Sequence, residues 1–142
     1  MIHKTAIIDS KAIVAESAEV GPYCVIGPNV VIGENVKILS HVNISGNTVI
    51  GKNTYLDNQI HIAHNVKIGD NCIIAGQVGF AGSSTIGNNV MIGGQAGISG
   101  HLKIGNNVQI GGGSGVVNDI PDNTKVMGYP AKDLKSFLRD SK

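Results

Sequence analysis

The chain has 142 residues, a formal net charge of +1 and 15% charged residues, which excludes a strongly basic nucleic-acid-binding protein. No apolar run reaches eighteen residues, so we expect no transmembrane segment. With two cysteines and no signal-peptide pattern after Met1, we expect a cytoplasmic protein without a disulfide framework.

A six-residue repeat organises the chain from Ile2 onward. Its first position is aliphatic in every repeat except at Phe80, over twenty consecutive hexads without an insertion. The fifth position is small, β-branched or aliphatic throughout, and we assign Ile120 to it in the last hexad. Cys24 and Cys72 also take the fifth position, where we expect small core residues and not nucleophiles.

A period of six does not match the 3.6 residues per turn of a helix, but it matches a short strand followed by a corner. The first and fifth positions share a parity, so both point to one face of the strand. Glycine recurs at the second position and asparagine at the fourth, and both tolerate left-handed backbone angles at corners. Three such sides close a coil of eighteen residues, and twenty hexads predict about 6.7 coils that stack to about 30 Å.

Three columns of residues eighteen apart change to glycine above the same coil. The columns run from His64 to Gly82 and Gly100, from His61 to Gly79 and Gly97, and from Asn58 to Gly76 and Gly94. Corners and tight packing explain many glycines, but they do not explain three bare columns above one coil. Missing side chains expose backbone N–H groups and admit a long, thin ligand such as an extended pantetheine arm.

A histidine beside exposed backbone N–H groups is an arrangement that acyl transfer from a thioester needs. The base takes a proton from the attacking amine or hydroxyl, and an N–H group stabilises the oxyanion by about 3 kcal/mol. We therefore interpret His64 as a functional histidine, and His3 and His41 as surface residues. The absence of a Ser-His-Asp arrangement in the sequence pattern favours direct transfer without a covalent enzyme intermediate.

The repeat ends after Ile120, and the remaining residues differ in character. We divide the chain into a β-helix over residues 1–120 and a C-terminal cap over residues 121–142. Within the cap, residues 126–131 predict an irregular segment and residues 133–139 a short amphipathic helix. A solenoid needs its open end covered, which is the role we expect for this segment.

The hexads over residues 2–120 resemble the hexapeptide repeats of bacterial acyltransferases. This resemblance implies an all-β fold, a single-stranded left-handed parallel β-helix with a triangular cross-section. It also implies an enzyme that assembles as a homotrimer, with three active sites in the clefts between the prisms.

A narrower resemblance covers residues 56–70, residues 81–83, residues 91–95 and the pair Gly100-His101. These segments resemble the UDP-3-O-acylglucosamine N-acyltransferases of lipid A biosynthesis. The resemblance implies transfer of a 3-hydroxyacyl chain from the phosphopantetheine thioester of acyl carrier protein, or alternatively from acyl-CoA, to the amine of a UDP-amino sugar.

The same resemblance implies roles for individual residues. His64 would be the general base, Gly82 the oxyanion-hole donor, and His101 an assisting residue that orients the acyl group. The predicted acyl or pantetheine groove comprises Asn58, Gln59, His61, Gly76, Gly79, Gly94, Gly97 and Gly100. No counterpart of the family's separate N-terminal uridine-binding domain precedes the first coil, so we do not extend the resemblance to uridine recognition.

Three other functions stay open at this point. The first is an acetyl-CoA-dependent N-acetyltransferase acting on a nucleotide sugar. The second is a zinc carbonic anhydrase with His61, His64 and His101 as ligands at a subunit interface, although their spacing is poor and we expect no bound metal. The third is an inactive scaffold, against which the joint presence of His64, Gly82 and His101 argues.

Overall fold

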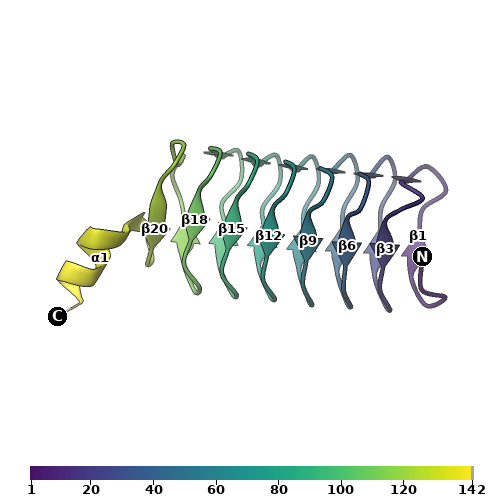
Figure 1. Ribbon diagram of the computed structural model, residues 1–142, viewed down its shortest axis with the longest axis horizontal. Coiled ribbons are helices and arrows are strands. Elements are labelled where there is room, and N and C mark those ends of the chain that lie inside the picture. The colour runs from purple at the N-terminus through teal and green to yellow at the C-terminus, as the bar shows by residue number, and fades with distance from the viewer. Residues whose placement is uncertain (142) are drawn as a thin grey trace.

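The computed structural model describes residues 1–141, which form a parallel β-helix ending in one short helix. Figure 1 shows the coils stacked along a single axis, with the N-terminus at one end and α1 at the other. The coils build three sheets of seven, six and eight strands, which we call face 1, face 2 and face 3. The predicted all-β class and solenoid architecture are confirmed.

Two-residue strands make up most of each face. Face 1 contains β1 (Ile7–Ile8), β4 (Val25–Ile26), β7 (Asn43–Ile44), β10 (His61–Ile62), β13 (Gly79–Phe80), β16 (Gly97–Ile98) and β19 (Gly115–Val116). Face 2 contains β2 (Ile13–Val14), β5 (Val31–Ile32), β8 (Val49–Ile50), β11 (Lys67–Ile68), β14 (Thr85–Ile86) and β17 (Lys103–Ile104). Face 3 contains β3 (Glu19–Val20), β6 (Lys37–Ile38), β9 (Tyr55–Leu56), β12 (Ile73–Ile74), β15 (Met91–Ile92), β18 (Gln109–Ile110), β20 (Lys125–Met127) and β21 (Lys132–Asp133).

Residues eighteen apart are neighbours on adjacent strands, as the repeat predicts. On face 1, His61 pairs with Gly79 and Gly79 pairs with Gly97, all in parallel register. The three faces meet at three edges, which we call the first corner (face 1 to face 2), the second corner (face 2 to face 3) and the third corner (face 3 to face 1). Left-handed backbone angles mark these corners, including φ +59° at Asn65 and +61° at His101.

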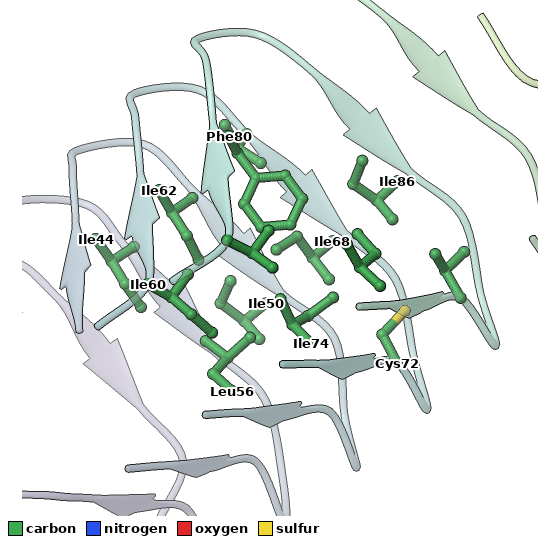
Figure 2. Packing of buried hydrophobic residues seen from close by; sticks show 14 of the residues in the cluster. Ile44, Ile50, Leu56, Ile60, Ile62, Ile68, Cys72, Ile74, Phe80 and Ile86 are labelled. Carbon is green, nitrogen blue, oxygen red and sulfur yellow. The ribbon is translucent and has the colours of Figure 1, made fainter. Parts of the chain in front are cut away.

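The interior is a stack of aliphatic side chains from the first and fifth positions, and Figure 2 shows them packed around Phe80. Cys24 and Cys72 are both fully buried. Burial raises the pKa of both thiols, which disfavours the thiolate that a nucleophile needs. The prediction that neither cysteine is a nucleophile therefore agrees with their surroundings.

The last coil is two residues shorter than the others. Ile104 bridges to Ile120, and Gln109 pairs with Lys125, so the offset between neighbouring coils falls from eighteen residues to sixteen. Our assignment of Ile120 to the fifth position is wrong, because it takes the first position above Ile104. The first corner between β19 and Ile120 is two residues shorter than in the coil below, and there the Asp119 carboxylate accepts a 2.8 Å hydrogen bond from the backbone N–H of Lys103.

Strand β20 then adds one more side to face 3 after residue 120, and β21 pairs with it in antiparallel orientation. The predicted short helix is present as α1 (Leu134–Asp140), and the Asp133 side chain caps it by accepting a hydrogen bond from the Ser136 N–H. Within residues 1–141, no helix combines the length and hydropathy needed to cross a bilayer.

Candidate active site

His64 stands at the first corner, between β10 and β11, with its side chain exposed. A Cβ atom placed on Gly82 in the next coil would lie 2.6 Å from His64 Nε2 and 2.7 Å from Cε1. The imidazole therefore fills the space that a side chain at position 82 would need. The structure therefore places His64 and Gly82 next to each other, and it explains why residue 82 in the next coil has no side chain.

The direction of the His64 side chain differs from that of equivalent residues at the second corner. There, Asp70 Oδ1 reaches back to the preceding coil and accepts a 3.0 Å hydrogen bond from the Lys52 N–H. The imidazole instead lies toward the next coil, and its Nδ1 lies 3.2 Å from Asn65 Oδ1. A neutral imidazole that donates from Nδ1 to this amide oxygen would present the Nε2 lone pair, which is the form a general base needs.

The backbone N–H of Gly82 is the second component of this site. At the second corner, a carboxylate or amide of the next coil caps the equivalent N–H groups of Lys52, Asp70, Asn88 and Asn106, as Asn88 Oδ1 does for Asp70 at 2.8 Å. Gly100 has no side chain to cap Gly82 in this way, and the Gly82 N–H donates to no acceptor among residues 1–141. A backbone N–H without an acceptor among residues 1–141 thus lies next to the His64 imidazole.

A buried threonine supports this corner from inside. Thr48 Oγ1 donates to the carbonyl of Ala63 at 2.9 Å and accepts from the N–H of Val66 at 3.1 Å. These two residues flank the His64-Asn65 segment, so one fully buried hydroxyl fixes both ends of the turn that carries the imidazole. The sequence contained an indication of this role that we did not use, because Thr48 is a polar residue at the inward-pointing fifth position of its hexad.

A groove of about 670 Å³ runs along face 1 beside this corner. Its floor includes Gly79 and Gly97, where an added Cβ would meet no atom within 4 Å, and His61 lies at one end. At the other end, the Tyr129 ring occupies the space that a side chain on Gly115 would need. Tyr129, which we expected only in the C-terminal cap, therefore also bounds the groove, and no motif in the sequence indicates this role.

The third corner carries the remaining predicted polar residues, and here the structure engages them in bonds within the protein. Gln77 Nε2 donates to Gln59 Oε1 at 2.9 Å, and Gln95 Nε2 donates to Gln77 Oε1 at 2.8 Å. Asn58 Oδ1 accepts from both the N–H and the hydroxyl of Ser40, at 3.0 and 2.9 Å. These side chains therefore stabilise the stacking of coils.

A shallow pocket of about 450 Å³ includes Gly76 and Gly94 together with these third-corner residues. Gln59 and His64 lie on either side of β10, one at the third corner and the other at the first corner. The third-corner members of the predicted groove thus lie across face 1 from the imidazole, and the structure does not bring them together with it.

His101 lies at the upper part of the first corner, exposed and next to Gly100. Its backbone N–H donates to the Gly82 carbonyl at 3.1 Å, which ties it to the same peptide segment. Among residues 1–141, no three His, Cys, Asp or Glu side chains converge to hold a metal ion, so His61, His64 and His101 form no ligand set within one chain.

Comparisons with known proteins locate the chain among transferases. Residues 2–77 match the family described as GMPPB C-terminal domain, and residues 83–118 match the family described as bacterial transferase hexapeptide (six repeats). The structure of UDP-N-acetylglucosamine O-acyltransferase (LpxA) from Moraxella catarrhalis is similar with a TM-score of 0.68 and 30% identity, over 99% of this chain and 77% of that chain. No curated protein sequence matches the chain.

Two acetyltransferase structures share the fold. A mutant of perosamine N-acetyltransferase from Caulobacter crescentus, in complex with CoA and GDP-perosamine, has a TM-score of 0.69 and 24% identity over 91% of this chain. The acetyltransferase domain of PglB from Neisseria gonorrhoeae, in complex with acetyl coenzyme A, has a TM-score of 0.60 and 23% identity over 94% of this chain. This chain covers 56% of each of those two chains.

Proposed function

Because this chain belongs to the hexapeptide-repeat acyltransferase superfamily, with residues 2–77 in the family of GMPPB C-terminal domains, we propose that it acylates the amine of a nucleotide-linked amino sugar. The observation that carries the proposal is the contact between His64 Nε2 and Gly82, next to a backbone N–H without an acceptor among residues 1–141. A general base and an oxyanion donor are thereby paired at one corner.

The proposed reaction is a direct transfer. The amine attacks the carbonyl carbon of a thioester, His64 Nε2 takes the amine proton, and the Gly82 N–H stabilises the oxyanion. The carbon–sulfur bond then breaks, the amide remains on the sugar, and the thiolate leaves with the proton that His64 returns. We assign to His101 the orientation of the acyl group, since it adjoins the same peptide segment.

The groove on face 1 suits the acyl donor. Its floor at Gly79 and Gly97 is open, so a thin, extended chain fits against the backbone there. We propose a 3-hydroxyacyl chain on the phosphopantetheine of acyl carrier protein as the donor, with acetyl-CoA as the alternative. The CoA complex of perosamine N-acetyltransferase and the acetyl coenzyme A complex of the PglB domain show that proteins of this fold bind CoA thioesters.

A sugar hydroxyl is the second candidate for the acceptor atom. It is favoured by the 30% identity to an O-acyltransferase, whereas the motif around His64 resembles N-acyltransferases of lipid A biosynthesis. The mechanism differs only in the attacking atom, because His64 removes a proton from either group.

A turnover assay tests this proposal. Purified protein is incubated with acyl carrier protein and CoA thioesters of short and long chains, and with UDP- and GDP-linked amino sugars. We expect thiol release coupled to a sugar whose mass has increased by one acyl group. Resistance of the product to hydroxylamine identifies an amide, whereas cleavage identifies an ester. The proposal fails if no combination yields an acylated sugar, which would leave the inactive scaffold as the better account.

We also propose a homotrimer. Faces 1 and 2 expose apolar side chains in their first coils, with Ile7 at 66%, Ile13 at 65%, Val25 at 41% and Val49 at 38% exposure. These residues flank the first corner below His64, and exposed apolar patches of this kind favour association. Sedimentation equilibrium is expected to give three times the chain mass of 14.7 kDa. A single-chain mass at assay concentrations would contradict this part of the proposal.

Replacing Thr48 with valine is expected to lower turnover as well as stability, because the hydroxyl holds both ends of the His64 turn. Thr54 provides the matched control, since its hydroxyl donates to Gly69 O and accepts from Cys72 N–H in the same geometry at the second corner. Each valine leaves a buried N–H and C=O without a partner, so each variant is expected to lose about 1–3 kcal/mol of unfolding free energy.

Chemical denaturation and steady-state kinetics on both variants separate the two effects. The expected difference is a reduced kcat in Thr48→Val only, with similar midpoints of unfolding for the pair. Equal kcat values in the two variants would show that Thr48 has no positioning role.

A further inference from the structure

Face 2 carries a cationic column directly beside the first corner. Lys67 on β11 pairs with Thr85 on β14, and Thr85 pairs with Lys103 on β17. The two lysines are therefore separated by two strand spacings, or about 10 Å, with a hydroxyl between them. Both lysine side chains are exposed, and Lys67 follows His64 by three residues.

The lysines of this column form no ion pair within residues 1–141. Lys37 on face 3, by contrast, lies 4.0 Å from the Glu19 carboxylate of the preceding coil. One acidic group, Asp119, also adjoins the column, where its Oδ1 accepts from the backbone N–H of Lys103. At the far edge of face 2, Asp70 Oδ1 is engaged by the Lys52 N–H. The uncompensated charge of the column is thus positive.

The opposite side of the first corner differs in charge. In the same three coils, face 1 presents His61, Gly79 and Gly97, and its strands after β10 carry no charged side chain. The imidazole of His64 therefore stands between an uncharged groove and a cationic face. An acyl chain suits the first surface, and an anionic group of the substrates suits the second.

We propose that Lys67 and Lys103, with the Thr85 hydroxyl between them, bind a phosphate or diphosphate group of a substrate. This inference rests on the proposed function, in which both substrates carry such groups: the diphosphate of the nucleotide sugar and the phosphate of phosphopantetheine or CoA. Lysine ammonium groups bind phosphate oxygens through charge-assisted hydrogen bonds. Lys67 follows the proposed base His64 by three residues, on the face that begins at the same corner.

Steady-state kinetics on Lys67→Ala, Lys103→Ala and the double variant test the site, with Lys125→Ala on face 3 as the control. Each single variant is expected to raise the KM of one substrate about tenfold, with kcat unchanged and with partial rescue by arginine. A rise in the KM of the nucleotide sugar assigns the site to the acceptor diphosphate. A rise in the KM of the thioester assigns it to the donor phosphate.

Calorimetric binding of inorganic pyrophosphate gives a readout that does not depend on turnover. Wild-type protein and Lys125→Ala are expected to bind it with equal affinity that weakens as salt is added, and the double variant to bind it at least tenfold more weakly. The inference is overturned if the double variant binds pyrophosphate as wild type does, or if neither KM changes. If no acylation is detected, the pyrophosphate measurement still tests whether Lys67 and Lys103 form a phosphate-binding site.

Discussion

Replacing His64 with alanine is expected to reduce acyl transfer by about 10²–10⁴-fold and to leave the β-helix intact. The three atoms nearest to an added Cβ on Gly82 all belong to the His64 imidazole, and its Nε2 makes no hydrogen bond to residues 1–141. The side chain is exposed at a corner, so its removal opens no core cavity. Turnover with saturating thioester, together with a thermal melt, measures both expectations.

His41→Ala is the matched control for this variant. His41 is also exposed at a corner, but at the third corner across face 1 from His64, where its ring lies against Tyr23 with a centroid distance of 5.1 Å. We expect wild-type turnover in this protein. If His64→Ala retained full activity, His64 would have no place in the mechanism, and another base would be required.

Replacing Gly82 with alanine is expected to cost nearly as much activity, although the substitution is small. The added methyl group would lie 2.6 Å from His64 Nε2, so the imidazole must rotate away from the oxyanion donor. Displacement of the general base is expected to cost about 10²-fold or more. Kinetic assays with wild-type levels of folded protein, confirmed by circular dichroism, measure this loss. Valine at this position is expected to be at least as damaging.

Gly46→Ala controls for adding a methyl group in the same column. Its Cβ would meet the Pro28 carbonyl at 3.0 Å and would not meet the imidazole, so turnover is expected to persist. The double variant Gly82→Ala, His64→Ala is expected to be no less active than His64→Ala alone. Both substitutions remove the His64 imidazole from its catalytic position, so the second causes no further loss. Additive losses in the double variant would indicate that Gly82 acts independently of the histidine.

The repeat alone was sufficient to predict most of the fold. Because each coil contacts only its neighbours, a constant offset of eighteen residues determines which side chains are stacked, and the pairing of His61 with Gly79 follows from arithmetic. The prediction failed where the offset changed. The first corner of the last coil is two residues shorter, and the hexad continues in a shifted register in which Ile120 and Val126, six residues apart, take first positions.

The sequence predicted which residues of the candidate site are stacked on one another, but it did not predict the orientation of their side chains. The sequence placed a histidine next to a glycine in the stack, yet the rotamer that turns the imidazole toward Gly82 depends on Asn65 and on the absence of a side chain above. Asn58 and Gln59 were included in the groove by resemblance, while their amides form hydrogen bonds within the stack. Composition does not reveal whether an exposed amide has a partner in the next coil.

A crystal structure of the protein with a non-hydrolysable acyl-pantetheine analogue tests the central claim most directly. We predict that the acyl chain lies along face 1 and that the analogue's carbonyl oxygen accepts a hydrogen bond from Gly82 N–H, with His64 Nε2 facing the carbonyl carbon. An analogue bound instead on face 3, in the apolar pocket of about 420 Å³ beside Ile73 and Met91, would contradict the assignment of the first corner as the catalytic centre.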